Sequence, residues 1–390
     1  MNRVDSINPG MTYVSGAKIT AAVECLQSNK SIQADYTRFK VDNAIKRVFD
    51  PVSDLYWTYY EVQKVNRSTK ETMGREGFPT VVLLHGICGT AGCYFYLMSK
   101  LADAGIKCIS AQYPEYYSPD EWIAGFMHFI EYLKLTKPMV FASDLGGFLL
   151  QLFVESYPES ICAMALCNSY RRTDTFSNSP EFRGAYGKLY TMLPHVLLRT
   201  IYVDYYIYPP ISKESHERVS VSEQMAKEFM ANELDQLTAG ELGSRISLQM
   251  TTDYVAAYGS KRMQHNRILI IETTNNHIPE DLNDDMRVAY YGCKVATMKS
   301  GGDFPYLSKP DEVVSFILVH LTNVHRLLNE KESSEETVNI QQSVISCGVT
   351  RELDEGSVRR SASASSVGSM INGHYSYEYG DYVSPSLSDA

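Results

Sequence analysis

One segment of the sequence has the residue types and spacing of a catalytic turn. Residues 141–148 read Phe-Ala-Ser-Asp-Leu-Gly-Gly-Phe, so an apolar strand is followed by a sharp turn and a helix that begins on glycines. This is the layout of a nucleophile elbow. The turn is crowded and needs small residues two positions before and two positions after its centre. Ala142 and Gly146 meet that requirement, Gly147 follows, and the centre is therefore Asp144.

An aspartate suits this central position. Asp tolerates the left-handed backbone angles of such a turn better than most residues, and a helix N-terminus stabilises its carboxylate. Ser143 would become the nucleophile only if the elbow moved by one residue, which would put Asp144 and Leu145 on the wrong sides of the turn. At the centre, Asp144 would hold a negative charge beside the oxyanion donors and compete with a substrate for them.

The donors of an oxyanion hole are expected from two loops. His85 and Gly86 follow the apolar run 80–84, and an HG loop at this place supplies a backbone N–H. Leu145, the residue after the elbow centre, is expected to supply the second N–H. His85 itself is interpreted as an ordered loop residue rather than a base.

The acid and the base are expected on two later loops. In proteins that have a nucleophile elbow of this kind, the order along the chain is nucleophile, acid, base. The acid position falls at Asn275, after the strand 267–272, and the base position falls at Asp303, after the strand 293–298. A histidine usually stands where Asp303 stands. The candidate replacement bases are His277, in the acid loop, and His320 and His325, which fall on the last predicted helix and are expected to have packing or surface roles.

The elements that must position these residues alternate along the chain. Short apolar runs bounded by Gly or Pro predict buried strands, and the 3.6-residue periodicity predicts helices. This rhythm predicts an α/β fold of the α/β-hydrolase type, with a mostly parallel sheet, helices on both faces and right-handed crossovers. The predicted strands are 54–60, as an edge strand, 80–86, 106–112, 138–143, 161–167, 267–272 and 293–298, and the helices are 120–135, 145–157 and 313–328.

Residues 170–262 break this rhythm and are predicted to form a helical cap above the sheet. The Tyr-rich stretch 201–208 within them has two interpretations. Tyrosines supply rigid amphipathic contact area, which would suit a binding surface. The alternative, which we favour from the sequence, is packing of the cap on the sheet.

Composition bounds the domain organisation. The chain has 390 residues, a formal net charge of −10 and 44% apolar residues, which excludes a wholly disordered or collagen-like chain and gives no basic footprint for nucleic acid. We expect a weakly ordered segment at 1–34, one hydrolase-like domain at 35–330 and a disordered tail at 331–390. The tail holds fourteen serines and nine acidic against four basic residues. Ser363, three residues after Arg360, is a candidate phosphorylation site.

Cysteine usage and hydropathy indicate the compartment. None of the eight cysteines forms a CxxC pair, and most lie in apolar runs, so buried free thiols in a reducing compartment are expected. The N-terminus has no apolar signal region, and no apolar stretch reaches the length of a membrane span. No His, Cys or carboxylate cluster has metal-ligand spacing, so neither a metal nor another cofactor is expected.

Six short stretches match the pattern of a known family in order and approximate spacing, over roughly residues 35–328. They are Asp35–Phe39, Gly89–Ala91, Gln112–Pro114, Leu145–Phe148, Leu166–Ser169 and Gly301–Leu307. On these stretches the chain resembles the maspardin family of α/β-hydrolase-fold proteins. The family usually carries Ser at the elbow centre and lacks the usual base His, and this chain departs further with Asp144. The tail has no evident counterpart in the family pattern.

The resemblance implies a function other than hydrolysis. It implies a cytosolic protein that associates peripherally with endosomal or trans-Golgi membranes and binds partner proteins, including the cytoplasmic tail of a membrane receptor. The residues agree with a pseudoenzyme, because Asp144, Asn275 and Asp303 occupy all three triad positions. We therefore expect a non-catalytic adaptor or regulator in vesicle trafficking.

A hydrolase is the alternative. An Asp nucleophile occurs on this fold in dehalogenases and epoxide hydrolases, so Asp144 could attack an ester, epoxide or haloalkane-type substrate. A base must then activate the water that cleaves the ester intermediate. Asp303 is a poor candidate for that base, because the intrinsic pKa of Asp is near 4 and a second carboxylate close to Asp144 would raise one pKa of the pair.

Overall fold

The computed structural model describes residues 32–64, 77–176, 192–202, 206–208, 219–256 and 262–349. The chain divides into two units, Met1–Glu332 and Ser333–Ala390. The fold below is that of the first unit.

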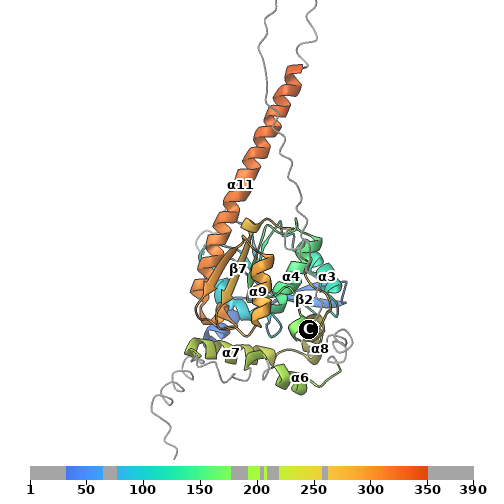
Figure 1. The fold of residues 1–390 in the computed structure, drawn as a ribbon, viewed down its shortest axis with the longest axis vertical. Coiled ribbons are helices and arrows are strands. Elements are labelled where there is room, and N and C mark those ends of the chain that lie inside the picture. The colour runs from blue at the N-terminus through green and yellow to red at the C-terminus, as the bar shows by residue number, and fades with distance from the viewer. Residues whose placement is uncertain are drawn as a thin grey trace, which may run out of the picture. The chain divides into compact units, whose positions relative to one another are not determined.

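An eight-stranded sheet forms the centre of this unit (Figure 1). Its order is β1-β2-β4-β3-β5-β6-β7-β8, with β1 and β2 antiparallel to their neighbours and the other pairs parallel. The central strands are apolar and buried along their whole length, which requires cover on both faces. The strands are β1 Lys46–Asp50, β2 Leu55–Val62, β3 Val81–Leu84, β4 Cys108–Gln112, β5 Met139–Ser143, β6 Ala163–Cys167, β7 Ile268–Thr273 and β8 Lys294–Met298.

Helices cover the two faces of the sheet. Figure 1 shows α3, α4 and α9 on one side and α11 along the other. The hydroxyl of Tyr290, at the end of α9, donates to Gln151 on α4, and Lys100 on α2 pairs with Asp311 on α11. This arrangement confirms the predicted mostly parallel sheet with helices on both faces. The helices are α2 Phe95–Asp103, α3 Pro119–Tyr132, α4 Asp144–Ser156, α9 Glu280–Ala289, α10 Pro305–Ser308 and α11 Pro310–Val349.

Some predicted elements differ from the structure. The edge-strand prediction for 54–60 is wrong, because β1 pairs with β2 on its outer side, with Val48 opposite Trp57. The sequence pattern did not indicate β1, α2, α9 or the helix over residues 32–42. The expected boundary after residue 34 falls within the helix over residues 32–42, and the one after residue 330 lies close to the division of the two units at Glu332, within α11. Ser363 and residues 350–390 of the expected tail lie outside the described residues.

In the described part of the predicted cap region the α-helices are α6 His195–Tyr202, α7 Val221–Leu234 and α8 Ala239–Gln249. Both α7 and α8 begin with a capping box, Ser220 with Glu223 and Thr238 with Glu241, which fixes where each helix starts. In α7 the apolar side chains of Phe229, Met230 and Leu234 are buried. These two helices bring side chains to the loops that follow the strands.

Burial of the cysteines agrees with the sequence. Six cysteines are described, all are free thiols, and only Cys293 is not fully buried. No helix in the described ranges has the length and apolarity needed to cross a membrane.

Candidate functional site

The elbow has Asp144 at its centre. β5 ends at Ser143 and α4 begins at Asp144, whose φ of 49° is the left-handed value that an elbow imposes. The Asp144 N–H donates to the Asn168 carbonyl at 3.1 Å. Gly146 is required at its position, because a Cβ atom there would lie 2.4 Å from the His85 carbonyl oxygen. The local sequence therefore forces the helix to start close to the loop after β3.

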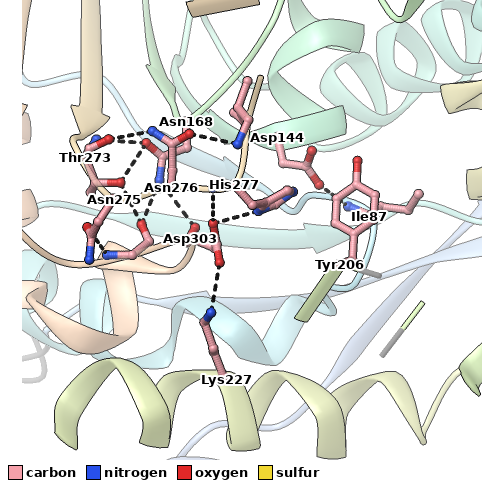
Figure 2. A network of polar contacts seen from close by, with 12 residues as sticks. Ile87, Asp144, Asn168, Tyr206, Lys227, Thr273, Asn275, Asn276, His277 and Asp303 are labelled. Atoms are coloured by element: carbon pink, nitrogen blue, oxygen red, sulfur yellow. Dashed lines mark hydrogen bonds and ion pairs between the residues drawn. The ribbon is translucent and has the colours of Figure 1, made fainter. Parts of the chain in front are cut away.

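The Asp144 carboxylate contacts the loop that was expected to supply an oxyanion donor. Its Oδ2 accepts the Ile87 N–H at 2.9 Å (Figure 2), and the nearby Leu145 N–H acts to lower the pKa of this carboxyl. The donor on the HG loop is thus Ile87, next to the predicted His85 and Gly86. The other oxygen, Oδ1, is buried and has no hydrogen-bond partner among the described residues.

A histidine and a carboxylate meet beside the elbow. His277 Nδ1 lies 2.6 Å from Asp303 Oδ1, and the His277 backbone N–H donates to the same oxygen at 2.7 Å (Figure 2). Lys227 of α7 lies 3.5 Å from the other oxygen, Oδ2. The second ring nitrogen, His277 Nε2, is buried and without a hydrogen-bond partner in the described part of the chain. The structure therefore supplies a complete histidine–carboxylate pair.

The roles of the two loops differ from the sequence prediction. The loop after β7, where the acid was expected, carries the histidine, and the loop after β8, where the base was expected, carries the carboxylate that holds it. Asn275, at the predicted acid position, instead donates to Glu223 of α7 and accepts the Gly302 N–H, each at 3.0 Å. Asn275 therefore ties the two loops to the cap through Glu223 and Gly302.

The elbow and the pair share a small enclosed cavity of about 20 Å³. A cavity needs roughly 10–15 Å³ of such volume to hold one water, so this one has room for about one water molecule. The lining includes Asp144, His277, Asp303, Cys88, Met230 and Tyr206. The Tyr206 ring centroid lies 4.7 Å from that of His277, so one tyrosine of the stretch 201–208 reaches the site.

Burial and charge perturb all three titratable groups. Burial raises the pKa of Asp144 above its ordinary value, although the Ile87 N–H and the charge of His277 oppose this shift. Burial acts to lower the pKa of His277, but the Asp303 carboxylate outweighs it and the pKa lies above the ordinary value. Burial acts to raise the pKa of Asp303, but His277 outweighs it and the pKa lies below the ordinary value. Each member of the pair thus stabilises the charged form of the other.

Arg245 of α8 holds the loop that carries the donor. Its buried guanidinium donates to the carbonyls of Ile87 and Gly89, at 3.0 and 2.6 Å, and lies over the Tyr113 ring. Because the Ile87 N–H bonds Asp144, Arg245 holds the loop that carries this donor. Sequence reasoning missed Arg245, since one arginine in a helix of mixed polarity has the pattern of an exposed side chain.

The other candidate residues lie in structural roles. Ser143 shares a 2.6 Å hydrogen bond with Tyr94, whose hydroxyl donates to Leu84, so Ser143 has a partner other than a base. His85 is buried, stacks on Tyr113 and bonds the Gly86 carbonyl through Nδ1. On α11, His320 Nε2 lies 3.3 Å from a backbone carbonyl and His325 stacks on Phe78. Among the described residues no group of three His, Cys, Asp or Glu side chains could hold a metal ion.

Known proteins resemble this chain in sequence over most of its length. No family model matches the chain. Maspardin of Danio rerio is 24% identical over 322 residues, which cover 81% of this chain and 96% of the relative. Maspardin of Homo sapiens is 24% identical over 329 residues, which cover 82% and 98%. The chain is a homologue of maspardin. A proline iminopeptidase of Lactobacillus crispatus matches a shorter region, with 27% identity over 136 residues that cover 31% of this chain and 43% of the relative.

Solved structures show the same fold as this maspardin homologue. A structure from work on carboxylesterases of Nitrososphaera gargenis has a TM-score of 0.55 at 12% identity and covers 72% of this chain and 99% of its own. A hydrolase from Pseudomonas aeruginosa PA01 has a TM-score of 0.55 at 12% identity and covers 71% and 98%. The fold is therefore that of the α/β-hydrolases, as predicted.

Proposed function

We propose that this maspardin homologue is a hydrolase that forms a covalent ester on Asp144. One observation carries the proposal: Asp144 and His277 line the same small cavity, and each has a buried atom, Oδ1 and Nε2, without a hydrogen-bond partner in the described ranges. Buried polar atoms are nearly always paired, and unpaired ones need an explanation. The two atoms would be unpaired because Asp144 Oδ1 is the nucleophile that contacts the substrate and His277 Nε2 is the base that contacts a water.

The first step is attack by Asp144. Oδ1 would attack an electrophilic carbon and form an ester, while the bond from that carbon to its leaving group breaks. Oδ2 stays on the Ile87 N–H and becomes the carbonyl oxygen of the ester. This donor is then in place for the negative charge that develops on this oxygen when water attacks. The sequence predicted that Asp144 would compete with a substrate for the oxyanion donors. In this mechanism, binding to the donor instead orients Asp144 as the nucleophile.

The second step is hydrolysis of the ester. A water in the cavity would lose a proton to His277 Nε2 and attack the carboxyl carbon of Asp144. Asp303 holds Nδ1 and the backbone N–H of His277, so it fixes the tautomer and stabilises the imidazolium that forms. Since the cavity holds one water, a substrate must displace side chains such as Tyr206 and Met230 that line it.

Trapping of the ester tests this function. In His277→Gln the first step remains and the second slows, by about 10²- to 10⁴-fold for loss of a general base. Incubation with a panel of epoxides and haloalkanes should therefore leave an adduct on Asp144 that peptide mass spectrometry locates. The matched control is His325→Gln, which alters a histidine on Phe78 outside the cavity. Absence of any adduct in both variants across the panel would refute the proposal.

Binding without turnover is the second candidate function. Its support is the size of the cavity, which admits about one water, together with the similarity to maspardin. In this case the chain acts as a cytoplasmic adaptor, binds the cytoplasmic tail of a membrane receptor and associates peripherally with endosomal or trans-Golgi membranes. Titration calorimetry with receptor-tail peptides tests it. Binding unchanged by Asp144→Asn, with no ester trapped, would favour the adaptor, and no binding to any peptide would count against it.

A further inference from the structure

A second cavity lies beside the loop that follows β3. Its volume is about 370 Å³, within the range of roughly 300–1,000 Å³ that is usual for small-molecule pockets. Residues 90–92 of this loop line it, whereas Gly86, Cys88 and Gly89 line the cavity at Asp144, and no residue lines both. The second cavity is therefore a separate place in the fold, and the two steps described above do not use it.

Three stretches that the sequence analysis singled out meet at this cavity. Tyr36 comes from the helix over residues 32–42, Thr90 follows β3, and Gln112 is the last residue of β4. Each belongs to one of the six stretches that match the family pattern, and none takes part in the proposed hydrolysis. Helix α7 adds Glu233 to the same wall. Four distant segments thus bring polar side chains to one place.

Glu233 is a buried carboxylate in the wall of this cavity, with 7% of its surface exposed. In the described part of the chain its hydrogen bonds come from two neutral hydroxyls, those of Thr90 and, at 3.4 Å, Tyr36, and both donate to Oε2. Burial raises the pKa of Glu233 above its ordinary value, although the Thr90 hydroxyl and the charge of Lys40 oppose this shift. Buried carboxylates are almost always paired with a cation or a similar partner. Glu233 therefore indicates a cationic group on a ligand.

A lysine supplies the opposite charge at the same cavity. Lys40 is an exposed residue of the lining, and its Nζ lies 4.5 Å from the centroid of the Tyr36 ring, whose hydroxyl donates to Glu233. The cavity thus has an anionic group in its buried wall and a cationic group at its exposed side. Other lining side chains have oxygens that can accept hydrogen bonds from an ammonium group: Thr58, Gln112, Asn232 and Gln236.

We propose that this cavity binds a small zwitterion, a molecule with a primary ammonium group and an acidic group, such as an amino acid. The ammonium group would bond Glu233 and the neighbouring amide and hydroxyl oxygens, and the acidic group would pair with Lys40. A cation without an acidic group leaves Lys40 unpaired, and an anion without an ammonium group meets the charge of Glu233. This inference is independent of the proposed hydrolase function.

The test compares three probes of the same chain length. γ-Aminobutyrate has both charged groups, n-butylamine has only the ammonium group, and butyrate has only the carboxylate. The common L-amino acids form a second arm. Dissociation constants for the full chain are measured by ligand-observed NMR titration. γ-Aminobutyrate should bind most tightly of the three matched probes, n-butylamine should bind more weakly, and butyrate should not bind.

Two substitutions assign the contacts. Glu233→Gln keeps the shape of the side chain and an acceptor for the hydroxyls but removes the charge, so it should weaken binding of γ-aminobutyrate at least about tenfold. The matched control is Glu228→Gln, the same change on α7 outside the cavity lining, which should alter the affinity less than about twofold. Lys40→Met should weaken γ-aminobutyrate about threefold or more and leave n-butylamine bound at least as tightly as before.

Each of the other outcomes overturns the inference. They are butyrate or n-butylamine bound as tightly as γ-aminobutyrate, equal effects of Glu233→Gln and Glu228→Gln, and no binding of γ-aminobutyrate or any common L-amino acid up to about 10 mM. If circular dichroism shows that Glu233→Gln is unfolded, Lys40→Met decides, because Lys40 is exposed. An unchanged affinity of Lys40→Met for γ-aminobutyrate then overturns the inference.

Discussion

Removal of the Asp303 charge tests whether the histidine–carboxylate pair exists as described. Asp303→Asn keeps the shape of the side chain but replaces one carboxylate oxygen with an amide NH₂ group. In one orientation this NH₂ group faces Lys227, and in the other it faces His277. Both neighbours are donors, so one hydrogen bond is lost in either orientation. Breaking a buried pair by removing one partner costs about 3–5 kcal/mol, and a charge-assisted hydrogen bond contributes about 1.5–3 kcal/mol. We expect a loss of about 3 kcal/mol in the free energy of unfolding.

The effect should depend on pH in a defined direction. The folded pKa of Asp303 is depressed, so its stabilisation is present above about pH 4, the unfolded value, and is lost as pH falls through the folded pKa. The folded pKa of His277 is raised, so its stabilisation is present below about pH 6.5 and is lost as pH rises through the folded pKa. The pair therefore stabilises the fold most between about pH 4 and 6.5.

Urea unfolding at pH 5.5 and pH 8.5 measures this dependence. The destabilisation by Asp303→Asn should be larger at pH 5.5 than at pH 8.5, because the stabilisation from the raised pKa of His277 is present below about pH 6.5 and is lost as pH rises. NMR titration should also show a lower pKa for His277 in the variant. The control is Asp284→Asn, which removes an exposed carboxylate beside Arg287 and should cost less than about 1 kcal/mol. An equal loss at both pH values, with the His277 pKa unchanged, would refute the pair.

Three further substitutions test the elbow and its loop. Gly146→Ala should destabilise the chain by about 3 kcal/mol or prevent folding in thermal melts, since its Cβ would lie 2.4 Å from a backbone oxygen that cannot move freely. Arg245→Met removes two hydrogen bonds to the loop that carries the Ile87 donor and should slow labelling of Asp144 at least tenfold. Arg245→Lys should recover part of the rate. Labelling of Arg245→Met at the wild-type rate would contradict the role given to Arg245. Ser143→Ala should leave Asp144 labelling intact and cost about 1 kcal/mol in urea unfolding, because Ser143 bonds Tyr94; loss of all labelling in a folded variant would identify Ser143 as the nucleophile.

The elbow could be predicted from the sequence because its signal is local. Small residues around Asp144, an apolar strand before it and glycines after it define one turn, and the φ of 49° agrees with that reading. The central strands were equally clear, because strands buried on both faces are continuous apolar runs. β1 has the sequence Lys-Arg-Val-Phe-Asp, which alternates too briefly to be distinguished from a loop.

The partners of Asp144 could not be predicted, because they depend on contacts between distant segments. The rule of acid before base along the chain assigned Asn275 and Asp303, and nothing in a single loop shows that His277 lies 2.6 Å from Asp303. Tyr206 and Arg245 have the same difficulty, since the cap helices that bring them to the site follow no recurrent pattern. Sequence reasoning therefore located the loops and misassigned the side chains within them.

The order of acid and base along the chain is separate from the geometry that the pair requires. Asn168, at the end of β6, holds both catalytic loops: its Oδ1 accepts the Thr273 N–H at 3.0 Å, and its Nδ2 donates to the Gly302 carbonyl at 3.0 Å. The loop after β7 and the loop after β8 are thus tied to one side chain, whichever of them carries the imidazole. A histidine and a carboxylate on facing loops can then exchange places and still form the same hydrogen bond. For this reason the absence of a histidine at position 303 does not by itself make a chain with this fold a pseudoenzyme.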